Sequence, residues 1–253
     1  MKPSRIFISS LLNEAFGVLL IIAVWEGVSL FYPSYIIPSP AAVVTGISAL
    51  LTVDFAHHLW ITACRIIAGF LIAFGIGTLS GVAAAVMKIT KPVNSLMVAL
   101  QVVPGTILGV VFLLMFGIGS STPILLVAVL TLPTLAINTI NGMAKRNIAQ
   151  EEYLKTLQCS RWQVARLSYI PALIPVLQSN LSLGMSMAVK VVVLGEFIGS
   201  QDGLGYLLNH ARIMFNMKEV FFYLLVLMLF TLLFQALQSS VFSTFLRKYY
   251  FPE

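Results

Sequence analysis

Polar side chains recur at helical spacing inside the apolar stretch 172–199. They are Ser179, Ser182, Ser186 and Lys190, and they share one face of a helix. A polar face on a helix within lipid must meet protein or water, because hydrocarbon offers no hydrogen bonds. Hydroxyl groups and an ammonium group can line a path for a solute, but they can equally join two helices. The spacing leaves both interpretations open.

Lys190 and two acids are the candidate charged groups within the apolar stretches. At ~1.5 Å per residue, Lys190 lies roughly 14 Å before the end of its stretch, where an unpaired lysine costs about 2.5–3.5 kcal/mol. It could reach the headgroups, pair with Glu26, or face a water-filled path beside the serines, which we favour because they share its face. Glu196 is a candidate gate or ion-pair residue, although we favour a place at headgroup level.

No catalytic residue is predicted. The sequence shows no legible set of nucleophile, base and orienting group, and its three histidines lack the spacing of metal ligands. The G-x-x-x-x-G-K-[ST] phosphate loop is absent, so no ATP site or other cofactor is expected in this chain. Its net charge of +6 lies beside apolar runs rather than in a basic cluster interleaved with aromatics, which argues against nucleic acid as a partner.

The composition indicates an integral membrane protein. Of 253 residues, 59% are hydrophobic and only 9% are charged, against about 25% charged residues in soluble domains. Long apolar runs without alternation favour helices over a barrel. We therefore predict an all-α membrane protein that forms a single transmembrane domain, 1–253, with six spans. The spans are expected at about 15–32, 62–87, 94–116, 123–143, 172–199 and 220–246.

The lysines and arginines are distributed unequally between the two sides of these spans. With the N-terminus inside, eleven of the fifteen basic residues lie on the cytoplasmic side. They are Lys2, Arg5, Lys88, Lys91, Lys145, Arg146, Lys155, Arg161, Arg166, Arg247 and Lys248. This asymmetry predicts that both termini and the loop between spans four and five are cytoplasmic.

Small residues and prolines mark three of the spans. Every fourth position of the second span is small: Gly69, Ala73, Gly77, Gly81 and Ala85. Such a stripe allows another helix to approach closely, either from a second subunit or within the same one. Pro104 and Pro133 are expected to kink the third and fourth spans.

The longest polar interruption, residues 147–175, has two helix starts. Asn147 can cap a first short helix, and Ser160 begins the S-x-x-Q form of a capping box for a second one. A tight break is expected at Gln158-Cys159. Pro171 is expected to end the second helix, because proline lacks the amide donor. The result is a compact cytoplasmic projection between spans four and five.

The projection resembles the cytoplasmic "EAA" loop of type I ABC importer permeases, in the nitrate, sulfonate and taurine branch. Glu152 takes the acidic position, Ser160-Arg161-Trp162 matches a motif of the branch, and Pro171 matches the proline. Tyr153 and Leu154 replace two alanines, Gln158 replaces a glycine, and Ile170 replaces a leucine. Further matches along the chain are Trp25-Glu26, Pro38-Ser39-Pro40, Arg65 with Gly69-Phe70, Phe116 to Gly119, and Glu196 followed by Gly203 to Tyr206.

The resemblance implies a permease subunit, not an enzyme, in a bacterial inner membrane. A homodimer would form the path by alternating access, with two cytoplasmic ATPases that bind ATP-Mg and an extracytoplasmic solute-binding protein. Segment 147–171 would be the coupling loop. Its expected ATPase contacts are Glu152, Leu157, Gln158, Ser160, Arg161 and Trp162.

A small oxyanion or organic sulfonate is the expected solute, with a vitamin precursor or another small solute as the alternative. An ATP-independent secondary transporter is the alternative from another class. Such a transporter often has inverted repeats, and none is evident in the sequence.

Overall fold

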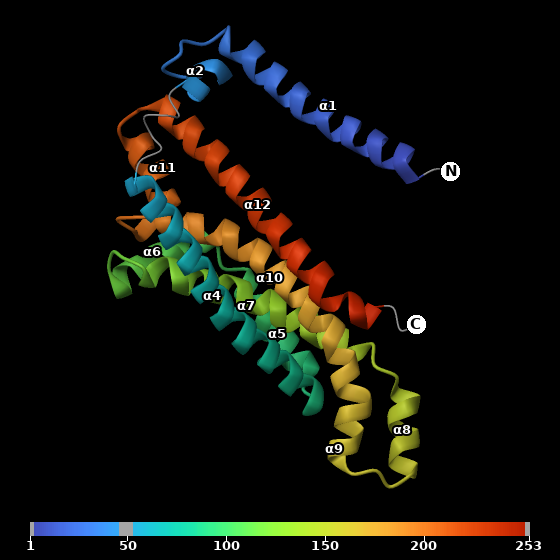
Figure 1. Ribbon diagram of the computed structural model, residues 1–253. Helices are drawn as coiled ribbons and strands as arrows, with labels where there is room; N and C mark the ends of the chain where they lie inside the picture. Colours follow the sequence, from blue (N-terminus) through green and yellow to red (C-terminus); the bar gives the residue numbers. More distant parts are fainter. Residues whose placement is uncertain (1–2, 46–52, 251–253) are drawn as a thin grey trace. The chain divides into compact units, whose positions relative to one another are not determined.

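The computed structural model describes residues 3–45 and 53–250, and every regular element in these ranges is helical (Figure 1). The predicted all-α class is confirmed. The helices in chain order are α1 (Pro3–Ser29), α2 (Pro40–Thr45), α4 (Val53–Val86), α5 (Thr90–Gln101), α6 (Gly105–Phe116), α7 (Ser121–Ala144), α8 (Ile148–Thr156), α9 (Arg161–Val164), the π turn η1 (Ala165–Tyr169), α10 (Ile170–Gly199), α11 (Leu204–Ile213) and α12 (Met217–Tyr250).

The chain divides into two compact units. One contains Met1–Ala56 and Leu207–Leu227, and the other contains His57–Tyr206 and Met228–Glu253. The single domain over 1–253 stays a prediction. Apart from Glu26, every candidate site residue belongs to the second unit, so the site is described within that unit.

Four described helical stretches are long and apolar enough to cross a membrane, or five if the bent pair α5 and α6 forms one span. The four are Asp54–Val86, Ser121–Ala144, Arg161–Gly199 and Met217–Phe234. The predicted first span corresponds to α1, of which the apolar part Phe16–Ser29 is a shorter helix. The count of six spans therefore stays a prediction.

The third predicted span, 94–116, is not one kinked helix. Helices α5 and α6 meet at a break of 83°. Pro104 has an extended backbone, with ψ of 129°, and immediately precedes α6. Proline cannot donate a hydrogen bond to the preceding turn, so α5 ends before it. In contrast, α7 continues through Pro133.

Helix α4 packs closely on α7 through its small residues. A β-carbon on Gly77 would lie 2.7 Å from the carbonyl oxygen of Leu132, and one on Gly81 would lie 2.5 Å from Cβ of Thr139. Such distances leave no room for a side chain. The small-residue stripe therefore serves packing within one subunit, which was one of the two readings left open by the sequence.

The prediction that Pro171 ends the second short helix is wrong. Helix α9 continues through η1 into α10, and the stretch Arg161–Gly199 is one helical run. In an ordinary α-helix, a proline ring clashes with the carbonyl group four residues earlier. The wider π turn immediately before α10 relieves that clash. The projection is therefore joined to a span without a break.

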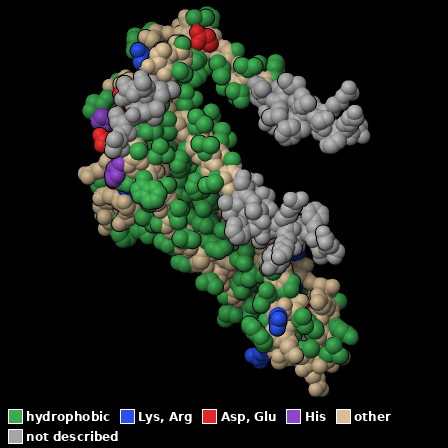
Figure 2. Space-filling view, viewed as in Figure 1, with side chains coloured by type: hydrophobic (Ala, Val, Ile, Leu, Met, Phe, Trp, Pro, Cys, Tyr) green, Lys and Arg blue, Asp and Glu red, His purple; other side chains and the backbone are tan. Residues whose placement is uncertain are grey.

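The core of the second unit lies between α4, α7 and α10. Its fully buried members are Ile66, Phe70, Val127, Ala188, Val189 and Val192. The surface is also apolar, and Figure 2 shows hydrophobic side chains over most of the face in view, with lysine and arginine near the α8–α9 end. Apolar side chains on both the inside and the outside of a helical bundle are typical of a lipid-surrounded protein.

Candidate functional site

The coupling projection, residues 147–171, begins both of its helices as the sequence predicts. The backbone N–H of Gln150 donates to Oδ1 of Asn147 at 3.1 Å. At the second start, the backbone N–H of Gln163 donates to Oγ of Ser160, and the backbone N–H of Ser160 donates to Oε1 of Gln163. These bonds satisfy amides that a helix start leaves without partners. Both predicted caps are confirmed.

Gln158 adopts the backbone conformation that normally favours glycine. Its φ is +56°, in the left-handed region. The N–H of Cys159 donates to the carbonyl oxygen of Leu154 at 3.1 Å, which is the long hydrogen bond of a Schellman motif. The turn that ends α8 therefore keeps the geometry of a glycine turn although a glutamine occupies the position.

A buried acid, Glu151, anchors the base of the projection. Its side chain is mostly buried and accepts a hydrogen bond from Nε of Arg146 at 3.1 Å. The hydroxyl group of Tyr169 donates to Oε1 of Glu151 at 3.3 Å, and the Arg146 guanidinium stacks 4.7 Å from the centre of the Tyr169 ring. This cluster ties the end of α7 to α8 and to η1.

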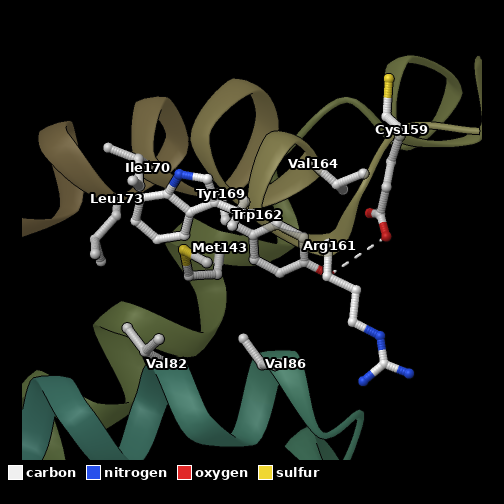
Figure 3. A pocket seen from close by; sticks show the side chains of 12 residues that line it. Val82, Val86, Met143, Cys159, Arg161, Trp162, Val164, Tyr169, Ile170 and Leu173 are labelled. Carbon is white, nitrogen blue, oxygen red and sulfur yellow. Dashed lines mark hydrogen bonds between the residues drawn. The ribbon is translucent and has the colours of Figure 1, made fainter. Parts of the chain in front are cut away.

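All six predicted ATPase-contact residues lie exposed on the projection, five of them at the turn between α8 and α9 (157–162) and Glu152 within α8. Two of them are large and apolar: Leu157 is 57% exposed and Trp162 is 70% exposed. Trp162 also lines a pocket of about 540 Å³ (Figure 3), in which Val82 and Val86 of α4 lie opposite Trp162 and Tyr169. The role of these residues in ATPase docking stays a prediction.

The predicted polar face of α10 is partly open. Ser182 and Lys190 are exposed, and Ser179 and Ser186 are half-buried. Within residues 57–206, no hydrogen bond or ion pair is found for Lys190. Its pairing with Glu26 of the other unit stays a prediction.

Asn180, next to this face, joins three helices inside the bundle. Its side chain is fully buried. It donates to Thr78 of α4 at 3.0 Å and to Thr139 of α7 at 2.8 Å, and it accepts from Nδ2 of Asn138 at 2.8 Å. Polar groups within lipid-surrounded helices need such partners. Helix α10 therefore combines a buried polar joint with an open polar face.

Glu196 is a buried ion-pair residue, and its role as a gate and its place at headgroup level stay predictions. It is 1% exposed and forms an ion pair with Arg65 of α4, at 3.0 Å between Oε1 and Nη1. The hydroxyl group of Thr62 donates to the same carboxylate at 2.9 Å, and so does the backbone N–H of Gly205 at 2.9 Å. Burying a charge is costly unless it is paired and hydrogen-bonded, and here both conditions are met.

The remaining donors of Arg65 bind the residues around this pair. Its guanidinium donates to Oγ of Ser120 before α7, to Oγ of Ser200, and to both the carbonyl oxygen and the carboxylate of Asp202. Burial by itself raises the pKa of Asp202, but the hydrogen bond and charge of Arg65 outweigh it, so the pKa is lowered from its usual value. A β-carbon on Gly203, whose φ is +98°, would overlap the Glu196 carboxylate.

Sequence reasoning named Glu196 as a candidate gate or ion-pair residue and Arg65 as a family match, but it did not pair the two and did not single out Asp202. The glycines that follow Glu196 were the available signal. Glycine allows the backbone to approach a neighbouring group closely.

Comparison with known proteins identifies the family. Residues 73–245 match the family described as "Binding-protein-dependent transport system inner membrane component". The chain belongs to this family. The predicted resemblance to type I ABC importer permeases is thereby confirmed.

Three relatives of this permease are named for different solutes. The riboflavin transport system permease protein RibX of Chloroflexus aurantiacus is 31% identical over 85% of this chain and 82% of its own. The formylaminopyrimidine transport permease protein ThiX of Halalkalibacterium halodurans is 26% identical over 85% of this chain and 87% of its own. The putative aliphatic sulfonates transport permease protein SsuC of Bacillus subtilis is 28% identical over 81% of this chain and 77% of its own. The relatives are named as transport subunits, in line with the expectation that the permease is not an enzyme.

A solved structure supports the fold. The inward-facing MetNI methionine ABC transporter superposes with a TM-score of 0.63 at 21% identity, covering 74% of the permease and 93% of the solved chain. At this level of identity the match concerns the fold alone. The permease is thus an integral inner-membrane protein with the fold of an ABC importer permease.

We predict that Gln158→Gly maintains or raises the stability of the permease, because glycine adopts a left-handed conformation that costs other residues about 1–2 kcal/mol. Gln158→Val should lower stability, because a β-branched side chain clashes there. Thermal unfolding of the purified protein in detergent is the measurement. The control is Gln150→Gly within α8, which should be destabilising by roughly 0.5–1 kcal/mol. A lower melting temperature for Gln158→Gly than for wild type would contradict the turn assignment.

We further predict that Glu196→Gln destabilises the permease by up to about 3–5 kcal/mol, since it leaves the buried Arg65 charge with only the partly exposed Asp202 carboxylate as its counter-charge. Thermal unfolding and protease cleavage within 200–203 are the two measurements. Glu152→Gln removes the same charge from an exposed site and should change neither. Equal melting temperatures for the two variants would show that the ion pair does not hold this end of the bundle.

Proposed function

We propose that the chain forms half of the translocation path of an ATP-driven importer and works by alternating access. A second copy of the chain completes the path, two cytoplasmic ATPases bind ATP-Mg, and an extracytoplasmic binding protein delivers the solute. Membership of a binding-protein-dependent transport family supports this arrangement. ATP would shift the equilibrium between inward-facing and outward-facing states by binding one of them more tightly.

The observation that carries the proposal is the exposed apolar tip of the coupling projection. Leu157 and Trp162 lie more than half exposed on a projection that hydrogen bonds at both helix starts hold in shape. Exposed aromatic anchors on a rigid element are typical of the centre of a protein interface. In this proposal the tip, with Glu152 and Arg161 beside it, inserts into a groove of the ATPase.

The proposed solute carries a negative charge, as a small oxyanion or organic sulfonate does. The cationic Lys190 on the open face of α10 supports this choice, and a sulfonate permease is among the relatives. Other relatives are named for riboflavin, formylaminopyrimidine, carnitine and choline. A vitamin precursor is therefore the second candidate. A quaternary ammonium solute fits poorly with an intramembrane lysine.

The orientation follows from the distribution of basic residues, with both termini and the projection in the cytoplasm. A cysteine at position 160 (Ser160→Cys), in a variant without the native cysteines, should react with an impermeant thiol reagent from the cytoplasmic side only. Reaction from the outside would contradict the orientation and, with it, ATPase docking at the projection.

We predict that Trp162→Ala weakens binding of the ATPase subunit by about 2 kcal/mol or more, which is roughly a thirtyfold loss of affinity. The measurement is co-purification of the ATPase with the tagged permease, together with transport-linked ATP hydrolysis. Trp60 of α4 provides the matched control, because it is a tryptophan with 69% exposure away from the projection. Trp60→Ala should leave ATPase binding unchanged. Normal ATPase binding by Trp162→Ala would refute the docking assignment.

A further inference from the structure

Helix α7 has an open polar face that the sequence analysis did not single out. Thr134, Asn138, Asn141 and Lys145 are spaced by four, three and four residues, which places them on one side of the helix. All four are exposed or half-buried. The opposite side is buried and consists of Leu135, Ala136, Thr139, Ile140 and Met143. A polar face of this kind on a lipid-surrounded helix meets a water-filled path or another polar surface.

A small pocket lies where this face meets α10. Its volume is about 290 Å³, close to the lower limit for sites that bind small molecules. Three polar side chains line it: Asn138 of α7, Lys145 immediately after α7, and Ser179 of α10. Small and apolar residues of the two helices, including Gly142 and Pro175, make up the rest of the wall. The pocket therefore connects the polar face of α7 to the polar face of α10.

The hydrogen bonds behind the pocket determine which groups face it. Asn180 donates through Nδ2 to the carbonyl oxygen of Leu135, so its Oδ1 is the atom that accepts from Asn138. Both hydrogens on Nδ2 of Asn138 are then used, one for Asn180 and one for Oγ of Ser179. Oγ of Ser179 is an acceptor in that bond, so its own hydrogen is left to donate. The polar groups of the pocket lining are thus the hydroxyl hydrogen of Ser179, the ammonium group of Lys145 and the amide oxygen of Asn138, which is an acceptor.

The pocket lining contains no carboxylate. Residues 57–206 include four acids, of which Glu196 and Asp202 pair with Arg65, and Glu151 pairs with Arg146. Glu152 is exposed on the projection and does not line the pocket. The described charge in the pocket is therefore positive.

We propose that this pocket binds the anionic group of the solute, a sulfonate, phosphate or carboxylate, near the inner end of the path. Lys145 supplies the counter-charge and Ser179 a directional hydrogen bond, a combination that suits an oxyanion. Lys145 is thereby assigned as a residue that determines charge selectivity. The inference rests on the proposed function, because the pocket needs a path through which the solute reaches it.

The test uses thiol reagents of similar size and opposite charge, so it does not require the identity of the solute. Ser179→Cys is introduced into a full-length variant in which Cys64 and Cys159 are replaced by alanine. The purified permease, with the subunits that accompany it, is placed in phosphatidylcholine nanodiscs, which are open on both sides and contain no anionic lipid. The two reagents are 2-sulfonatoethyl methanethiosulfonate, an anion, and 2-(trimethylammonio)ethyl methanethiosulfonate, a cation. The reaction rate of each reagent at position 179 is divided by the rate of the same reagent with a small thiol in solution.

We expect the anionic reagent to be favoured at position 179. The Lys145 charge attracts the anionic reagent and repels the cationic one. Lys145→Gln should therefore lower the ratio of the anionic to the cationic reagent's rate roughly fivefold. Lys145→Glu should make the cationic reagent the faster one. Lys91→Gln removes a charge from the exposed start of α5, outside the pocket lining, and should leave the ratio unchanged.

Two outcomes would overturn the proposal. A ratio that does not respond to Lys145→Gln would show that Lys145 does not set the charge preference of the pocket. Failure of both reagents to react would show that a second polar surface closes this face. ATPase binding through Trp162 is measured separately, so either outcome can be distinguished from failure of the proposed function.

Discussion

The buried ion pair between Arg65 and Glu196 constrains one whole end of the second unit. A guanidinium with 2% exposure needs partners for its donors, and the chain supplies them from the residue before α7, the end of α10 and the loop that follows. The loop must also bring two backbone amides close to Thr62 and the carboxylate, those of Leu204 and Gly205. Glycine at 203 makes that approach sterically possible. The charges therefore determine where three helices and a loop meet.

The helical run Arg161–Gly199 connects this end to the coupling projection. Its 39 residues correspond to about 58 Å at 1.5 Å per residue. The π turn allows the run to pass Pro171 without a break, and Glu151, Arg146 and Tyr169 fasten the projection to its base. In the proposed importer, a movement of α9 would therefore act on the same rigid element that carries Glu196. The polar joint at Asn180 holds the middle of that element against α4 and α7.

The two open polar faces explain how such a path could select solutes by charge. The face on α10 ends in Lys190 and the face on α7 ends in Lys145, while the four acids within residues 57–206 are paired or lie on the projection. The relatives are named for solutes of differing charge. A lining that repels cations would distinguish the solute of this permease from those for which the choline and carnitine permeases are named.

The sequence by itself determined the helical class, most spans, both caps of the projection and the family. These properties depend on local pattern: apolar run length, capping residues at fixed spacing and ordered motifs. It did not determine that Pro104 separates two helices or that Pro171 interrupts none, because the cost of a proline depends on the geometry of the turn around it. It also did not show that Glu151 is buried while its neighbour Glu152 is exposed, because that difference depends on tertiary packing. Only the tertiary structure paired Arg65 with Glu196, 131 residues apart, and placed Lys145 beside Ser179, because contacts between helices depend on their packing rather than on sequence spacing.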